Sequence, residues 1–93
     1  MRAIKLESEA QEKILRYLEK ISYVVKIIVA NRSGVVDVIG CYKGRFYSIE
    51  LKRLGEKPTA LQIVNILKVR KHGGIAFTAT SLDEVKTYFN NLQ

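Results

Sequence analysis

The chain has little cysteine, little histidine and no long apolar run, and each shortage excludes a class of protein. Cys41 is the only cysteine among 93 residues, so no internal disulfide can form. A reducing, intracellular setting is therefore expected (cytoplasm, nucleoid or virus-infected host cell). His72 is the only histidine, which argues against a metal site built from cysteine and histidine. No apolar run approaches the length of a membrane helix, and no signal-peptide or lipidation pattern occurs, so no membrane partner is expected.

Acidic residues are also in the minority. The chain has 9 Asp and Glu against 16 Lys and Arg, which gives a formal net charge of +7 and a pI near 9.7. The basic residues are spread along the chain, which indicates a folded basic surface rather than a basic tail. A small intracellular domain of this charge favours a polyanion partner, most simply nucleic acid. The alternative is a basic protein whose charge serves no such partner.

Hydrophobic periodicity predicts one α/β domain over 1–93, with a small mixed β-sheet flanked by helices. A two-residue "KG" turn at 43–44 predicts a hairpin, and a helical crossover before the last strand predicts that this strand is parallel to a neighbour. The predicted order is α-β-β-β-α-β-α, with a helix at 6–21, strands at 23–30, 35–42 and 45–53, a helix at 58–72, a strand at 75–80 and a helix at 81–92.

Charged residues interrupt the predicted hairpin at opposed positions. Side chains alternate between the two sides of a strand, so Ser48, Glu50 and Lys52 share one side. Counting outward from the 43–44 turn places Asp37 opposite Glu50. Two carboxylates side by side in a sheet repel each other, and a bound divalent cation removes that objection. The pattern therefore points to a site for such a cation.

The cation expected there is Mg²⁺, or Mn²⁺ in its place. Mg²⁺ takes oxygen ligands and commonly binds one or two carboxylates together with water and substrate phosphate. Lys52 beside it could orient or deprotonate an attacking water and neutralise charge on the phosphate. The alternative is purely structural: Asp37 is a residue at a strand edge, and Glu50 and Lys52 form a surface salt bridge.

An Asp in a strand, a hairpin and then Glu-X-Lys at the close of the next strand resembles the PD-(D/E)XK nuclease superfamily. The segment "SGVVDVIGCYKGRFYSIELKRLGEKPTALQ", followed by "GGIAFTATSLDEV", is similar to the VRR-NUC nucleases, and the layout is similar to that of archaeal Holliday junction resolvases. The resemblance covers about 33–85 well and the first helix more loosely. It implies a restriction-endonuclease-like core and hydrolysis of DNA backbone phosphodiesters.

The resemblance also implies roles for individual residues. Asp37 and Glu50 would be metal ligands, with the backbone carbonyl of Leu51 as a third. Lys52 would be the catalytic lysine. Gln62, on the helix that follows "KPT", would point back toward the metal and position water or phosphate. Without the resemblance, the alternative interpretation is that Gln62 is an ordinary exposed glutamine on a helix surface.

The family further places a glutamate of the first helix at the site. Glu7, Glu9 and Glu12 are the candidates, and Glu7 is preferred because it shares the helix stripe that carries the apolar residues. Glu7 would be a catalytic residue and a possible metal ligand, although a first-turn Glu also suits the helix dipole. The family usually has proline before the motif aspartate, whereas this chain has Val36.

The expected activity is that of a Mg²⁺- or Mn²⁺-dependent endodeoxyribonuclease that leaves a 5′ phosphate. The chain offers no separate sequence-reading module, so selection of branched DNA, above all the four-way junction, is expected. A homodimer is expected too, held by the first strand and the apolar last helix. The alternatives are a general nicking or flap nuclease, a non-catalytic DNA-binding module of the same fold, and a partner-binding subunit. Five basic residues near the motif are the expected contacts to the DNA backbone: Arg32, Lys43, Arg45, Arg53 and Lys57.

Overall fold

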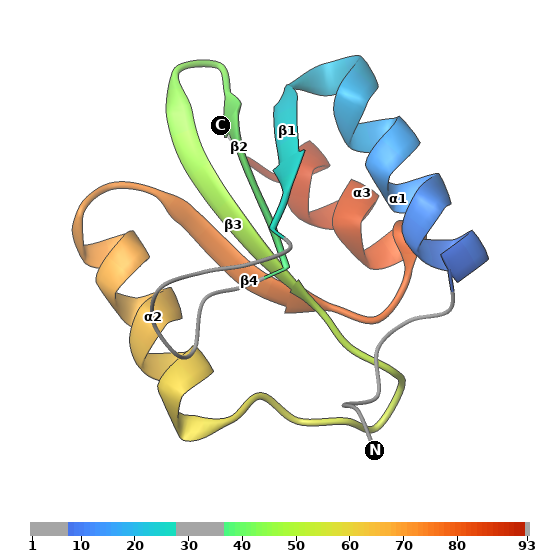
Figure 1. The fold of residues 1–93 in the computed structure, drawn as a ribbon. Coiled ribbons are helices and arrows are strands. Elements are labelled where there is room, and N and C mark those ends of the chain that lie inside the picture. Colours follow the sequence, from blue (N-terminus) through green and yellow to red (C-terminus); the bar gives the residue numbers. More distant parts are fainter. Residues whose placement is uncertain (1–7, 28–36, 93) are drawn as a thin grey trace.

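The computed structural model describes residues 8–27 and 37–92. In this part of the chain three helices and four strands follow the predicted order α-β-β-β-α-β-α (Figure 1). They are α1 (Ser8–Ile21), β1 (Tyr23–Lys26), β2 (Val38–Tyr42), β3 (Arg45–Leu51), α2 (Ala60–Lys71), β4 (Ile75–Ala79) and α3 (Leu82–Asn90). The fold class predicted from the sequence is confirmed.

The four strands form one sheet in the order β1-β2-β3-β4. The first two pairings are antiparallel, and β3 pairs with β4 in parallel, as the helical crossover predicted. The turn between β2 and β3 is the predicted one: Lys43 and Gly44 have φ of 50° and 83°, the left-handed backbone that a two-residue hairpin needs. Val38 pairs with Ile49, so the register counted outward from the turn is also confirmed.

Several predicted bounds need correction. The strand predicted at 23–30 ends at Lys26, and residues 28–30 lie outside the described part of the chain. The strand predicted at 45–53 ends at Leu51. The helix predicted from Pro58 begins two residues later, because Thr59 takes the N-cap position and holds the first turn with its side chain.

Helices cover both sides of the sheet. In Figure 1, α1 and α3 lie together on one side, and α2 lies on the other. An apolar core lies between the sheet and the helices α1 and α3. In it the Phe77 ring stacks on Tyr88 and meets Phe89 edge to face. The buried apolar side chains of this core are Ile14, Leu18, Val38, Tyr47, Ile49, Leu51, Ile75, Phe77, Ala79, Val85 and Phe89.

Tyr47 illustrates how closely this core is packed. Its ring is fully buried, and its hydroxyl lies 2.8 Å from Ser22 Oγ, which in turn donates to the Leu18 carbonyl. Burial raises the pKa of the Tyr47 phenol above its ordinary value of 10.0. A Cβ at Gly40 would come within 2.5 Å of the Tyr47 ring, so glycine is needed where this ring crosses β2.

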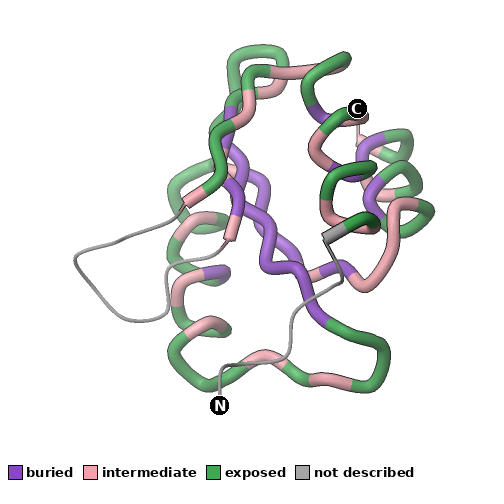
Figure 2. Tube along the Cα trace, turned by 45° about the vertical axis from the view of Figure 1, so that its right-hand side comes forward, coloured by how far each residue is buried: buried purple, intermediate pink, exposed green. Residues whose placement is uncertain are grey.

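Burial is concentrated in the central strands, as the purple trace in Figure 2 shows. The helices differ in what they contribute. Within α2, all of whose residues the structure describes, Ile66 alone is buried. Across the described part of the chain, no helix has the length and apolar character needed to cross a bilayer.

Candidate active site

Asp37 lies directly before the first residue of β2, where that strand meets β1 and β3. Its backbone carbonyl accepts a hydrogen bond from the Ile27 N–H at 2.7 Å. Its side-chain Oδ2 accepts one from the Leu51 N–H at 3.0 Å. Beyond the pairing of β2 with β3, the Asp37 side chain is therefore hydrogen-bonded to Leu51, the last residue of β3. Leu51 is the chain neighbour of Glu50, and the sequence predicted that Asp37 lies opposite Glu50.

Glu50 and Lys52 form an ion pair in which Lys52 Nζ lies 3.5 Å from Glu50 Oε2. The alternative interpretation placed this pair at the surface, and that part is wrong. Glu50 is 0% and Lys52 5% exposed, on the side of the sheet that α2 covers (Figure 1). Although β3 ends at Leu51, the Lys52 N–H still donates to the Ala79 carbonyl at 2.8 Å, which extends the parallel pairing with β4 by one bond.

The burial of this pair carries an energetic cost. Taking a carboxylate and an ammonium out of water costs several kcal/mol per ion, and their mutual attraction offsets this only where the geometry is good. A hydrophobic pair of similar volume is often as stabilising or more so. Their burial is therefore weak evidence for a purely stabilising role, and it makes Glu50 and Lys52 candidates for a functional site.

Two further polar side chains lie on the same side of the sheet. Ser48 is 3% exposed and precedes Glu50 by one strand repeat, and Thr78 of β4 is the register partner of Glu50. The alternation of side chains along β3 predicted that Ser48 lies on this side, but no role was predicted for Ser48. Thr78 was missed because the register of a parallel pair is not set by a hairpin turn.

Gln62 has a structural task that the sequence analysis did not assign. Its Oε1 accepts a hydrogen bond from the Thr59 N–H at 2.9 Å, and its own N–H donates to Thr59 Oγ1 at 3.1 Å. This reciprocal pair is a capping box, which satisfies donors that the first turn of a helix leaves free. The signal was present in the sequence as "TALQ", a Thr followed three residues later by Gln.

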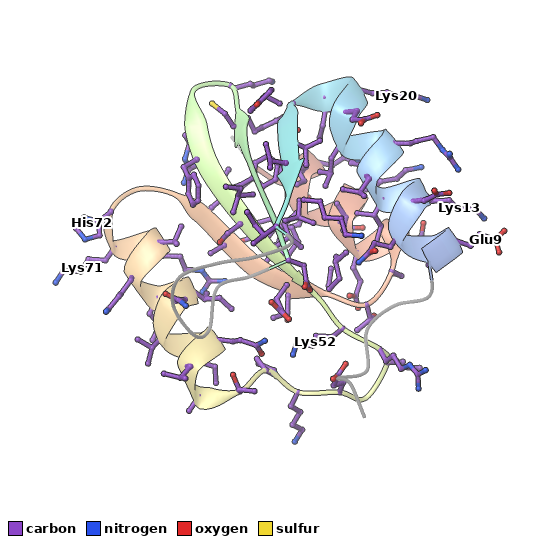
Figure 3. The ribbon with its side chains drawn as sticks, in the orientation of Figure 1. Glu9, Lys13, Lys20, Lys52, Lys71 and His72 are labelled. Carbon is purple, nitrogen blue, oxygen red and sulfur yellow. The ribbon has the colours of Figure 1, made fainter. Side chains whose placement is uncertain are left out.

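The remaining predicted carboxylates do not gather at the site in the described part of the chain. Glu7 lies outside the described residues. Glu9 and Glu12 are exposed on α1, which packs on the opposite side of the sheet from α2. Figure 3 shows Glu9 at the outer end of α1, well away from Lys52.

The five predicted DNA contacts divide into separate groups. Arg53 and Lys57 are exposed in the loop that follows Lys52. Lys43 and Arg45 lie at the hairpin end of β3, about 17 Å from Glu50 for a strand of this length. Proximity in the sequence thus did not translate into proximity at the site for these two. Arg32 lies outside the described residues.

Comparisons with known proteins bear on this arrangement. Neither a family model nor a curated protein matches the chain. A solved structure described as a VRR_NUC domain aligns with a TM-score of 0.78, over 98% of this chain and 100% of that one, at 24% sequence identity. The chain has the fold of a VRR_NUC domain. The match covers nearly the whole chain, so it includes β2 and β3, which carry Glu50 and flank Asp37 and Lys52.

Within this VRR_NUC fold, the donors present suit a hard divalent cation. Among residues 8–27 and 37–92, no three Asp, Glu, His or Cys side chains gather in one place. Asp37 and Glu50 supply two carboxylates at one end of β3, and the Leu51 carbonyl leaves the strand on the same side as its N–H, toward Asp37. Two carboxylates completed by water and substrate phosphate are a common Mg²⁺ environment, so the residues fit the ion.

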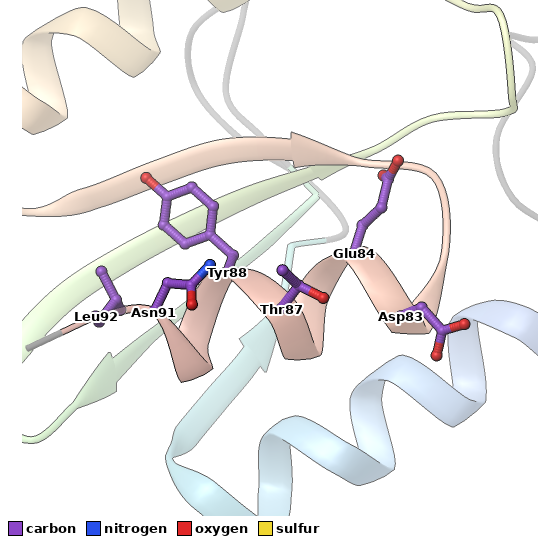
Figure 4. A pocket seen from close by; sticks show the side chains of 6 residues that line it. All are labelled: Asp83, Glu84, Thr87, Tyr88, Asn91 and Leu92. Carbon is purple, nitrogen blue, oxygen red and sulfur yellow. The ribbon is translucent and has the colours of Figure 1, made fainter.

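A hollow elsewhere on the VRR_NUC fold has no part in this chemistry. It measures ≈ 500 Å³ and runs along α3 (Figure 4). Because α3 covers the side of the sheet opposite to Glu50, the carboxylates of this hollow cannot join those of Asp37 and Glu50. Its lining residues are Asp83, Glu84, Thr87, Tyr88, Asn91 and Leu92.

Proposed function

We propose that the chain is an endodeoxyribonuclease that hydrolyses DNA backbone phosphodiesters with Mg²⁺ or Mn²⁺. The single observation that carries the proposal is the buried ion pair of Glu50 and Lys52, which stands beside an Asp37 carboxylate fixed to the Leu51 N–H. The fold of a VRR_NUC domain and the net charge of +7 support it.

In the proposed reaction, Asp37, Glu50 and the Leu51 carbonyl hold the metal. When bound there, the ion would lower the pKa of a water and polarise the scissile phosphate. Lys52, held by Glu50 at 3.5 Å, orients that water and donates a hydrogen bond to a phosphate oxygen where negative charge develops. The water gives up one proton to solvent as its oxygen bonds to phosphorus, the bond from phosphorus to the 3′ oxygen breaks, and that oxygen takes a proton from solvent. The products are a 3′ hydroxyl and a 5′ phosphate.

The preferred DNA is proposed to be branched, with the four-way junction first. The described part of the chain is occupied by the sheet and its three helices, and none of these elements is left over to read base edges in a groove. Contacts to phosphate fix position and shape without reading sequence. Arg53 and Lys57, exposed beside Lys52, are the proposed contacts nearest the scissile phosphate.

We propose in addition that two copies pair, in an intracellular setting, so that two sites can make paired cuts. In the last helix, which was expected to form part of the contact, Val85 and Phe89 are buried in the core. The support comes from α2 instead. Its outward side exposes four large apolar side chains: Leu61 (55%), Ile63 (44%), Val64 (45%) and Leu67 (56%).

A cleavage assay tests the activity. Labelled four-way junction, linear duplex and flap DNA are incubated with Mg²⁺, with Mn²⁺ and with chelator. The tested variant is Asp37→Asn, which keeps an oxygen for the Leu51 N–H but removes the charge. The matched control is Asp83→Asn, an exposed aspartate in the first turn of α3.

The expected result is paired, symmetric cutting of the junction that chelator and Asp37→Asn abolish and Asp83→Asn leaves intact. Cutting of all three substrates would support a general nicking or flap nuclease. Tight binding without cutting under any metal condition would overturn the enzyme and favour a DNA-binding module.

The proposed pairing is tested by sedimentation as a function of protein concentration. Leu67→Glu is expected to give a monomer, since it places a charge in the centre of the exposed side of α2. Leu54→Glu is the control, because Leu54 is 90% exposed in the loop after β3. A monomeric wild type at all concentrations would contradict the pairing.

A further inference from the structure

A second feature lies on the α2 side of the sheet, at the opposite end of β3 from Glu50. It is a groove of ≈ 500 Å³ between the start of β3 and the last two turns of α2. Six residues line it: Phe46, Asn65, Lys68, Val69, His72 and Gly74. Figure 3 shows His72 and Lys71 at this end of α2, far from Lys52 near the other end.

The groove is held in shape by short contacts at its edge. Gly74 leaves space where a side chain would collide, since a Cβ there would come 2.7 Å from Val69 Cγ1 and 3.1 Å from the Phe46 carbonyl. Arg45 Nε donates to the Gly73 carbonyl at 3.1 Å and so ties the hairpin to the end of α2. The groove is therefore a fixed feature of the fold, with a wall on the hairpin and a wall on the helix.

Phe46 is the unusual member of the lining. Its side chain is 46% exposed, although it lies on the same side of β3 as the buried Ser48, Glu50 and Lys52. An aromatic ring half open to water in a groove is a surface on which another flat ring can stack.

The charged residues in the chain segments around this ring are all basic. The segments 38–49 and 57–82, which contain the hairpin tip, α2 and β4, have no Asp or Glu, and the two acidic residues between them are Glu50 and Glu56. Lys68 and His72 are the basic side chains of the lining, and Arg45 borders it through its bond to the Gly73 carbonyl. A ligand that fits must therefore combine a flat aromatic part with negative charge.

An unpaired nucleotide has both properties. Stacking of a base on an aromatic side chain and contact of its phosphate with basic residues is the usual way in which proteins hold single strands. A base inside a duplex is already stacked on both faces, so Phe46 discriminates in favour of unpaired DNA. Phe46 lies four residues from Glu50, about 13 Å along the strand, which equals about four stacked nucleotides at the 3.4 Å rise of one DNA strand.

We propose that this groove binds an unpaired nucleotide of the DNA, with its base on Phe46 and its phosphate on Lys68 and His72. The substrate class rests on the proposed nuclease function, and the binding itself requires no cleavage. The groove would hold a single-stranded arm about four nucleotides from the phosphate being cut.

The test measures the affinity of a fluorescent oligothymidine by anisotropy in chelator, so that no cleavage can occur. Phe46→Leu is expected to weaken binding about 5- to 160-fold, which corresponds to the range for loss of one stacked base. Phe46→Tyr is expected to retain the wild-type affinity, because it keeps the ring. The matched control is Tyr23→Leu, which removes an aromatic side chain that is 71% exposed on β1, outside the groove.

The phosphate contact has its own readout in the salt dependence of binding. Lys68→Ala is expected to lower the slope of log affinity against log salt by about 0.7, the value for one phosphate contact in a single strand. Lys20→Ala is the control, because Lys20 is exposed at the far end of α1. Equal slopes for wild type and Lys68→Ala would overturn the assigned phosphate contact.

Unchanged affinity of Phe46→Leu for the oligothymidine would overturn the proposal. So would a change in its sedimentation at the concentrations used, because the groove would then be covered by a second copy of the chain. A wild-type protein that cuts no DNA with Mn²⁺ but binds the oligothymidine, with weaker binding by Phe46→Leu, would leave the groove standing and remove the nuclease, which keeps the two proposals separate.

Discussion

Over residues 47–52, the two sides of β3 and its extension are equally buried and chemically opposite. Tyr47, Ile49 and Leu51 point into an apolar core under α1 and α3, and each is 0% exposed. The three residues that alternate with them, Ser48, Glu50 and Lys52, point toward α2 and are between 0% and 5% exposed. One strand therefore carries part of the apolar core on one side and the residues of the proposed site on the other.

The helices on the two sides differ in the same sense. α1 and α3 place Ile14, Leu18, Val85 and Phe89 in the core. In α2, every residue of which is described, Ile66 alone is buried. Much of the apolar surface of α2 faces outward. The side that carries the charges is thus held by fewer apolar contacts, which is expected where a site must admit a substrate.

The largest effect on stability is expected from breaking the buried pair. Glu50→Ala removes the carboxylate of the pair and leaves the Lys52 charge buried, and Lys52→Ala removes the ammonium and leaves the Glu50 charge buried. Each variant is expected to lower the free energy of unfolding by about 3–5 kcal/mol. The double variant Glu50→Leu/Lys52→Met is expected to recover the loss. Urea unfolding of the four proteins measures this, and two single losses below about 1 kcal/mol would contradict a desolvated pair.

The opposite side is probed by the residue next to Glu50. Ile49→Ala is expected to lower the free energy of unfolding by about 2–5 kcal/mol, because it leaves a cavity in the core. DNA cleavage per folded molecule is expected to stay at the wild-type level. Cleavage is measured at a temperature where denaturation curves show the variant folded, and a loss as large as that of Asp37→Asn would mean that the two sides are not separable.

The capping box separates a structural role from a chemical one on α2. Thr59→Ala and Gln62→Ala each remove half of the box and are expected to cost about 1 kcal/mol of stability. Only Gln62→Ala is expected to reduce cleavage, by about tenfold, as for one lost hydrogen bond to a charged phosphate. Equal cleavage by the two variants would leave Gln62 with the cap alone.

The smallest effect is expected at Tyr47. Its folded-state pKa is raised above 10.0 by burial, with the hydrogen bond to Ser22 acting weakly in the opposite direction. The resulting stability is fully present below pH 10 and is lost as the pH rises through the raised pKa. Tyr47→Phe should therefore lose less stability than the wild type between pH 9 and pH 11. Parallel curves of unfolding free energy against pH would show that Tyr47 does not titrate differently in the folded state.

Local rules allowed the hairpin to be predicted and with it the core of the site. The "KG" turn sets the register, and this placed Asp37 beside the end of β3 before any tertiary contact was known. The burial of Lys52 could not be predicted this way, because it depends on where α2 crosses the sheet. The partnership of Glu50 with Thr78 depends on a parallel pairing between segments far apart in sequence. The distance of Lys43 and Arg45 from Glu50 follows from the length of β3, which separates neighbours in sequence by most of a strand.

The most direct test of the α2 side as a metal-dependent site is the thermal unfolding midpoint measured against Mn²⁺ concentration. A ligand that binds only the folded chain raises this midpoint progressively as its concentration passes its Kd. We expect the midpoint of the wild type and of Asp83→Asn to rise with Mn²⁺, and that of Asp37→Asn to stay constant, since its hydrogen bond to the Leu51 N–H remains possible but its charge is gone. Equal shifts for wild type and Asp37→Asn would contradict a metal site at the end of β3.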